Sequence, residues 1–318
     1  MTARRPLVAV ALTLAFALVL AGCGRTEPTP VDDDEDAAAI DATIDDSFAP
    51  EAMVDADEAL PPIDSPHPPP DVIRDDCPDP SATLIYLITD RNALLSYYPP
   101  TNAFHHIGTV RCLDAPSGTT PFSMAVDRKG TAYVVYNDGE LYRVSTKTAA
   151  CTKTPFVPRG AFRSFGMAFT ADGIGPGETL YLASSVAITN ELGTLDLSTF
   201  SVHTVAPFVP DLEEAELTGT GDGRLFAFHT PIHARTARIA QLDKATATVI
   251  SENDLPTIEF GGGWAFAFWG GSFYLFTAPG AFTSHVTRFD PSDGSTTLVA
   301  TFGSIIVGAG VSTCAPEL

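Results

Sequence analysis

Phe122-Ser123-Met124-Ala125-Val126 is followed by the polar turn Asp127-Arg128-Lys129-Gly130 and by a second apolar run, Thr131-Ala132-Tyr133-Val134. Two short apolar runs around a glycine turn are typical of paired β-strands. The pattern recurs along the chain, and its aromatic residues are 47, 48, 45 and 48 residues apart, at Tyr86, Tyr133, Tyr181, Phe226 and Tyr274. A period of about 40 to 50 residues with short strands predicts the blades of a β-propeller.

Each copy of the pattern contains further strands. An apolar inner strand precedes the aromatic strand, as at residues 165–169 and 264–268, and a fourth strand rich in Thr and Val follows a turn, as at residues 295–302. Helical periodicity is absent. Five aromatic and five inner strands predict an all-β, five-bladed β-propeller over residues 77–318. A two-sheet sandwich is the alternative, but it does not account for five copies at one period.

The two ends of the repeat region predict how the ring closes. The first copy begins at its aromatic strand, with no inner strand before Tyr86, whereas the chain ends with an unassigned apolar strand at residues 305–313. We expect this C-terminal strand to complete the first blade, because closure of the ring removes an exposed sheet edge.

The blade around Met124 resembles the blade motif of NHL-type and SMP-30/gluconolactonase-type propellers through Met124-Ala125-Val126-Asp127, Gly130 and Tyr133-Val134. The resemblance extends loosely over residues 81–316 and implies a propeller fold. It also implies, for the gluconolactonase-like enzymes, a divalent cation held by several carboxylate and amide side chains of the inner strands. This chain offers one such residue, Glu216, whereas hard cations take about six oxygen ligands. Lactonase activity is therefore disfavoured, and no metal ligands or cofactor are assigned.

Four of the five cysteines belong to the propeller region, and an even number in an exported chain favours disulfides. If the last strand lies beside the first aromatic strand, Cys314 comes near Cys77. Cys112 follows the outer strand of the first blade and Cys151 begins the outer strand of the second. We expect the pairs Cys77–Cys314 and Cys112–Cys151, one of three connectivities. Neither a CxxC motif nor a Cys/His cluster at zinc spacing is present.

The fifth cysteine gives the predicted location. Leu20-Ala21-Gly22-Cys23 resembles the lipobox of bacterial lipoproteins, and it follows two arginines and an apolar run too short to span a membrane. Residues 1–22 are therefore interpreted as a lipoprotein signal peptide and Cys23 as the lipidated residue, which would anchor the protein to a lipid bilayer of the cell envelope. Gly24 rather than Asp follows Cys23, which by resemblance to enterobacterial sorting favours the outer membrane.

An acidic segment separates the lipobox from the propeller. Residues 24–76 carry 17 acidic and 2 basic residues together with two proline clusters. Self-repulsion, stiffness and low apolar content predict a disordered tether over residues 23–76. The whole chain has a formal net charge of −21, with 18 Lys or Arg against 39 Asp or Glu. Nucleic acid is excluded as an expected partner, because binding it requires clustered positive charge.

Candidate binding residues lie where the predicted blades face the axis or turn back between their second and third strands. Glu216 occupies an inner-strand position at which the other aligned residues are small, so it is either a ligand or cation contact or a structural carboxylate. The loops supply Asp90, Asn137, His229, His233 and His285. No nucleophile-elbow, zinc-protease or phosphate-loop motif occurs. We therefore favour a module that binds a protein or small molecule at this loop face. A cation-dependent hydrolase that uses Glu216 is the alternative.

Overall fold

Five four-stranded antiparallel sheets make up this computed structural model, which describes residues 77, 83–112, 115–173, 175–185, 190–230, 236–280 and 282–318. The predicted signal peptide, Cys23, the acidic tether and His233 lie outside these residues. The five sheets confirm the predicted five-bladed, all-β propeller. A short 3-10 helix, η2 (Pro99–Thr101), follows β2.

From axis to rim, blade 1 consists of β20 (Ile306–Val311), β1 (Ile85–Thr89), β2 (Ala93–Tyr98) and β3 (Ala103–Thr109). Blade 2 consists of β4 (Pro121–Val126), β5 (Thr131–Tyr136), β6 (Leu141–Ser145) and β7 (Cys151–Lys153). Blade 3 consists of β8 (Phe165–Ala171), β9 (Glu178–Ser184), β10 (Glu191–Asp196) and β11 (Ser201–Pro207). Blade 4 consists of β12 (Ala215–Gly219), β13 (Leu225–His229), β14 (Ala237–Leu242) and β15 (Val249–Leu255). Blade 5 consists of β16 (Trp264–Trp269), β17 (Ser272–Thr277), β18 (Ser284–Asp290) and β19 (Ser295–Phe302).

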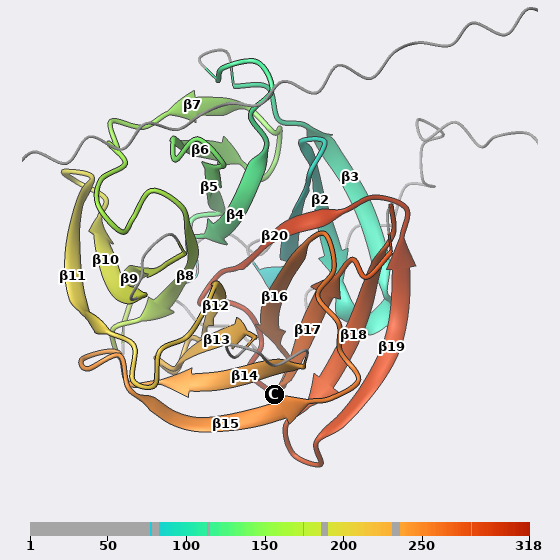
Figure 1. The fold of residues 1–318 in the computed structure, drawn as a ribbon. Coiled ribbons are helices and arrows are strands. Elements are labelled where there is room, and N and C mark those ends of the chain that lie inside the picture. Colours follow the sequence, from blue (N-terminus) through green and yellow to red (C-terminus); the bar gives the residue numbers. More distant parts are fainter. Residues whose placement is uncertain are drawn as a thin grey trace, which may run out of the picture. The chain divides into compact units, whose positions relative to one another are not determined.

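The inner strands surround the axis in the order β20, β4, β8, β12 and β16, and each contacts the next around the ring (Figure 1). β20 is the last strand of the chain, yet it pairs with the first strand, β1, so that Ile85 lies opposite Val311 and Leu87 lies opposite Ala309. The C-terminal strand therefore completes the first blade, as predicted. The ring consequently has no open edge on the axis side of blade 1.

Apolar side chains fill the spaces between neighbouring blades and form the core. Between blades 4 and 5, Phe226 and Phe228 of β13 pack against Phe266 and Phe268 of β16. The side chains along each strand point alternately toward one neighbouring blade and toward the other, because successive strand residues point to opposite faces of the sheet. Each blade is thus buried on both sides, which accounts for the dense apolar content of the inner and second strands. Among the described residues, no helix is long and apolar enough to span a membrane.

Two disulfides hold the ring together, and both have the predicted connectivity. Cys77 pairs with Cys314 directly beyond the closing strand, across a sequence separation of 237 residues. Cys112 pairs with Cys151 and joins the segment after β3 to the first residue of β7. The first bond closes a very long loop, for which the chain-entropy model gives about 5 kcal/mol of stabilisation.

Candidate functional site

Glu216, the predicted axial residue, extends across the centre of the ring. It is 4 % exposed, and its Oε2 accepts a hydrogen bond of 2.7 Å from the Ser123 hydroxyl. Ser123 belongs to β4 and Glu216 to β12, two inner strands that are separated by β8 on one side and by β16 and β20 on the other. The bond therefore joins two blades that are not neighbours. It closes the axis at the level of these residues.

Close approach of the inner strands explains why only one long side chain occupies this level. A Cβ atom on Gly166 of β8 would lie 2.1 Å from the carbonyl oxygen of Ala215 and 2.8 Å from the Cα of Glu216. A Cβ atom on Gly308 of β20 would lie 3.1 Å from the carbonyl carbon of Ser123. Side chains at these positions would collide with backbone, so small residues surround Glu216 and leave its carboxyl room to cross the axis.

The protonation state of Glu216 follows from this burial. Burial in the ring raises the pKa of its carboxyl well above the usual value, the Ser123 hydrogen bond lowers it, and the charge of the exposed Glu214 raises it further. Burial therefore favours the neutral form of this carboxyl more than that of an exposed glutamate. Within the part of the chain that the structure describes, no three His, Cys, Asp or Glu side chains converge in a way that could hold a metal ion. These contacts favour the structural interpretation of Glu216.

Of the loop residues predicted from sequence, the four that the structure describes, Asp90, Asn137, His229 and His285, lie at the end of the ring where the inner strands begin, hereafter the upper face, but in separate blades. Asp90, in the β1–β2 turn, accepts a hydrogen bond from the Ser304 hydroxyl. Asn137, in the β5–β6 turn, accepts one from the backbone N–H of Thr120. Both contacts stabilise local loop structure. Among the described residues, no hydrogen bond or ion pair joins one predicted candidate to another.

His229, the last residue of β13, is the one buried member of a polar network among the described residues that the sequence did not reveal, and its partners are partly exposed. Its Nε2 lies 3.0 Å from Glu252 Oε1, and Arg238 Nη1 lies 2.7 Å from Glu252 Oε2. Arg238 Nε also lies 2.6 Å from Asp254 Oδ1. Burial lowers the pKa of His229, although the Glu252 carboxylate opposes that effect. The network arises because register places Arg238 beside His229 and Asp254 beside Arg238 on successive strands, a pairing that spacing alone does not identify.

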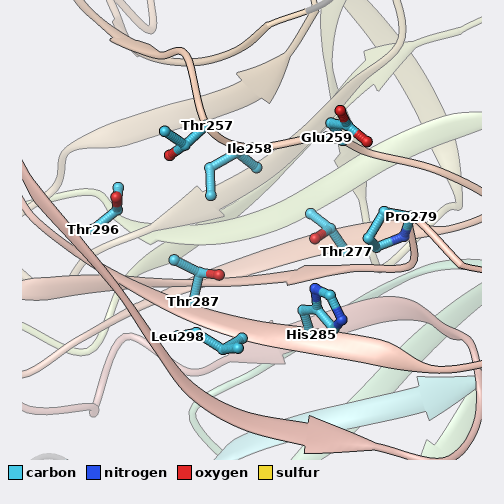
Figure 2. Close-up of a pocket in the computed structure, with 9 residues that line it drawn as sticks. All are labelled: Thr257, Ile258, Glu259, Thr277, Pro279, His285, Thr287, Thr296 and Leu298. Atoms are coloured by element: carbon cyan, nitrogen blue, oxygen red, sulfur yellow. The ribbon is translucent and has the colours of Figure 1, made fainter.

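His285, the second residue of β18, lines a groove on blade 5 with a volume of about 350 Å³ (Figure 2). The groove lies between the segment that connects β15 to β16 and the strands β17, β18 and β19. Four of its residues are threonines, and the full lining consists of Thr257, Ile258, Glu259, Thr277, Pro279, His285, Thr287, Thr296 and Leu298. We call it the blade-5 groove. Of its residues, sequence reasoning identified only His285, because threonine in a strand carries no distinctive functional signal.

The same place in blade 4 is occupied by the charged network. Thr277 pairs with His285 in blade 5 as His229 pairs with Arg238 in blade 4. Two residues further along the third strand of each blade, Thr287 pairs with Leu298 as Ala240 pairs with Glu252. Where blade 4 has mutually paired charges, blade 5 therefore has hydroxyls around an open groove.

Comparisons with known proteins find distant structural likeness alone. No protein-family model matches the chain, and no curated protein matches it. Solved structures that resemble it include a crystal structure of a nidogen/laminin complex, at 15 % identity and a TM-score of 0.44, covering 74 % of this chain and 81 % of that one. TolB from Acinetobacter baumannii has 16 % identity and a TM-score of 0.40, covering 68 % of this chain, which spans about half (52 %) of the TolB chain. The Dos1 propeller has 12 % identity and a TM-score of 0.39, covering 73 % and 71 %.

Proposed function

We propose that this protein is a lipid-anchored protein of the cell envelope whose propeller is a binding module. The observation that best supports the lipid anchor is the way in which the cysteines pair. The chain has five, and the two disulfides use Cys77, Cys112, Cys151 and Cys314. Cys23 is the one that remains, and it stands directly after the lipobox-like residues. Disulfides also suit an extracytoplasmic domain, because they persist in oxidising compartments.

The closed axis supports binding at the rim and upper face rather than chemistry at the centre. The Glu216 carboxyl accepts a hydrogen bond from Ser123, and burial raises its pKa, which supports a structural role over the hydrolase alternative. The lipid anchor and acidic tether would hold the propeller away from the membrane surface, where its loops and grooves are accessible to a partner. The tether's charge favours an extended chain.

Cys23→Ser is expected to abolish lipidation and leave the signal peptide uncleaved, because the modified thiol is absent. In cells labelled with a palmitate analogue, the wild-type protein should carry label and sediment with membranes, whereas the variant should carry none. Cys314→Ser is the matched control, since it removes a cysteine from the propeller and should leave labelling intact. Normal processing and membrane partitioning of Cys23→Ser would refute the proposed anchorage.

A further inference from the structure

We propose that the blade-5 groove binds a neutral saccharide. The inference rests on the proposed role of the propeller as a binding module, and it gives that role a site and a ligand class. At about 350 Å³ the groove falls near the lower end of the usual range for small-molecule sites, about 300–1,000 Å³. That volume suits a ligand of one or two sugar rings rather than a protein surface.

Two threonine side chains that are more than nine-tenths buried and open onto the groove carry the argument. Thr277 is 3 % exposed and Thr287 is 7 % exposed. Neither hydroxyl has a hydrogen-bond partner among the described residues, whereas other buried threonines such as Thr146 and Thr154 bond to backbone carbonyls. Figure 2 shows both threonines on the groove wall, with the Thr287 hydroxyl directed toward the side on which Thr277 and His285 lie. Neither oxygen is sealed off from the groove, so both hydroxyls are available to donate to and accept from a ligand that enters it.

The remaining lining defines the chemistry of that ligand. Each threonine hydroxyl can donate one hydrogen bond and accept others, and Glu259 and His285 add further polar atoms. Ile258, Pro279 and Leu298 provide apolar surface beside them. None of the described residues that line the groove is Lys or Arg, so these residues offer an anionic ligand no fixed positive charge. A molecule with several hydroxyls, apolar C–H faces and no net charge matches this surface, and a saccharide has all three properties.

A second groove on the ring provides a useful contrast. The corresponding space on blade 3 has a volume of about 640 Å³ and is lined in part by Thr199, Ser201 and Thr204. These three residues are exposed, and the Thr199 hydroxyl already donates to Asp196. The blade-3 groove is therefore larger but has no hydroxyl on a mostly buried side chain, and we assign the site to blade 5.

The test is ligand-observed NMR on the full chain. The probes are maltose, cellobiose and chitobiose as neutral saccharides, sialyllactose as an anionic one, and a Ser/Thr-rich pentapeptide. At least one neutral saccharide should bind, and Thr277→Val with Thr287→Val should weaken that binding at least about tenfold, because two hydrogen bonds are lost while side-chain shape is kept. Thr297→Val is the matched control, since Thr297 stands between two groove residues on β19 and points away from the groove.

Unchanged melting of both variants confirms that the groove, rather than the fold, has been altered. Saccharide binding that survives the double valine variant would overturn the site. Binding of sialyllactose or the peptide alone would overturn the ligand class while leaving a binding module. Absence of binding by every probe would overturn the saccharide inference, and the Cys23 labelling experiment would still decide the anchorage separately.

Discussion

Truncation after Gly303 is expected to abolish cooperative folding of the propeller. The cut removes β20, whose backbone pairs with β1 from Ile85 to Thr89 and which lies between the inner strands β16 and β4. It also removes Cys314, the partner of Cys77. Buried β1 residues such as Leu87 would face solvent along an unpaired strand edge, a surface that promotes aggregation. Thermal unfolding followed by circular dichroism should show no cooperative transition for the truncated protein.

Two controls separate the strand from the disulfide. Ending the chain after Pro316 removes only the last two residues and should leave melting close to that of the wild type. Cys314→Ser keeps β20 but loses the disulfide to Cys77, so this variant should fold and have a lower melting temperature than the wild type. A soluble truncated protein that unfolds cooperatively would contradict ring closure by the C-terminal strand.

The ring could be inferred from sequence because its determinants are local and repeated. The aromatic positions from Tyr86 to Tyr274 recur at one period, and the missing inner strand at one end matches the extra strand at the other. The disulfide Cys77–Cys314 follows from that closure alone. The candidate site was less predictable from sequence. Thr277 and Thr287 line a groove because of how the neighbouring strands and the segment between β15 and β16 pack around them. The periodicity of the sequence predicts the strands, but it does not predict how the connecting segment packs against them.

Gly166→Val is expected to destabilise the propeller severely. A Cβ atom at Gly166 would lie 2.1 Å from the carbonyl oxygen of Ala215, a backbone atom of the neighbouring inner strand. The strands would have to separate at the axis, and separation would disturb the Ser123–Glu216 hydrogen bond beside them. Overpacking of a core costs about 1–3 kcal/mol and sometimes more. We expect at least about 3 kcal/mol, which corresponds to a fall of about 6–12 °C in melting temperature.

Gly303→Val is the matched control for this substitution. A Cβ atom on Gly303 would have no heavy atom within 4 Å, so the same change in residue should shift the melting temperature by about 2 °C or less. Equal melting of Gly166→Val and the wild type would mean that the inner strands are further apart than the structure places them.

More of the axis than of the groove could be predicted from the sequence. Alignment of the inner strands identified Glu216 as the one long polar side chain at its level, but it left a ligand contact and a structural role open. The contact that favours the structural role is the hydrogen bond to Ser123, 93 residues earlier in the chain. Register within a blade cannot predict which of two non-adjacent blades faces Glu216 across the ring.

The pH dependence of Glu216 distinguishes these roles. The folded protein holds the Glu216 proton more tightly than the unfolded chain does. Its contribution to stability is therefore complete below the ordinary carboxyl pKa and is lost as the pH rises toward the raised pKa. Gln has no such proton to lose. Glu178, whose pKa burial raises to about 7, adds the same trend to wild type and variant alike, so the difference between the two proteins isolates Glu216.

The most direct test of a closed, structural axis is the melting temperature of wild type and Glu216→Gln at about pH 5 and about pH 8, each with excess Ca²⁺ and with EDTA. We predict that the melting temperature of Glu216→Gln, measured relative to that of the wild type, rises by at least about 3 °C from the lower pH to the higher pH. We also predict that Ca²⁺ changes the melting temperature of neither protein relative to EDTA. A wild-type protein that Ca²⁺ stabilises, together with a Gln variant that no longer responds, would contradict the account and make Glu216 a cation ligand.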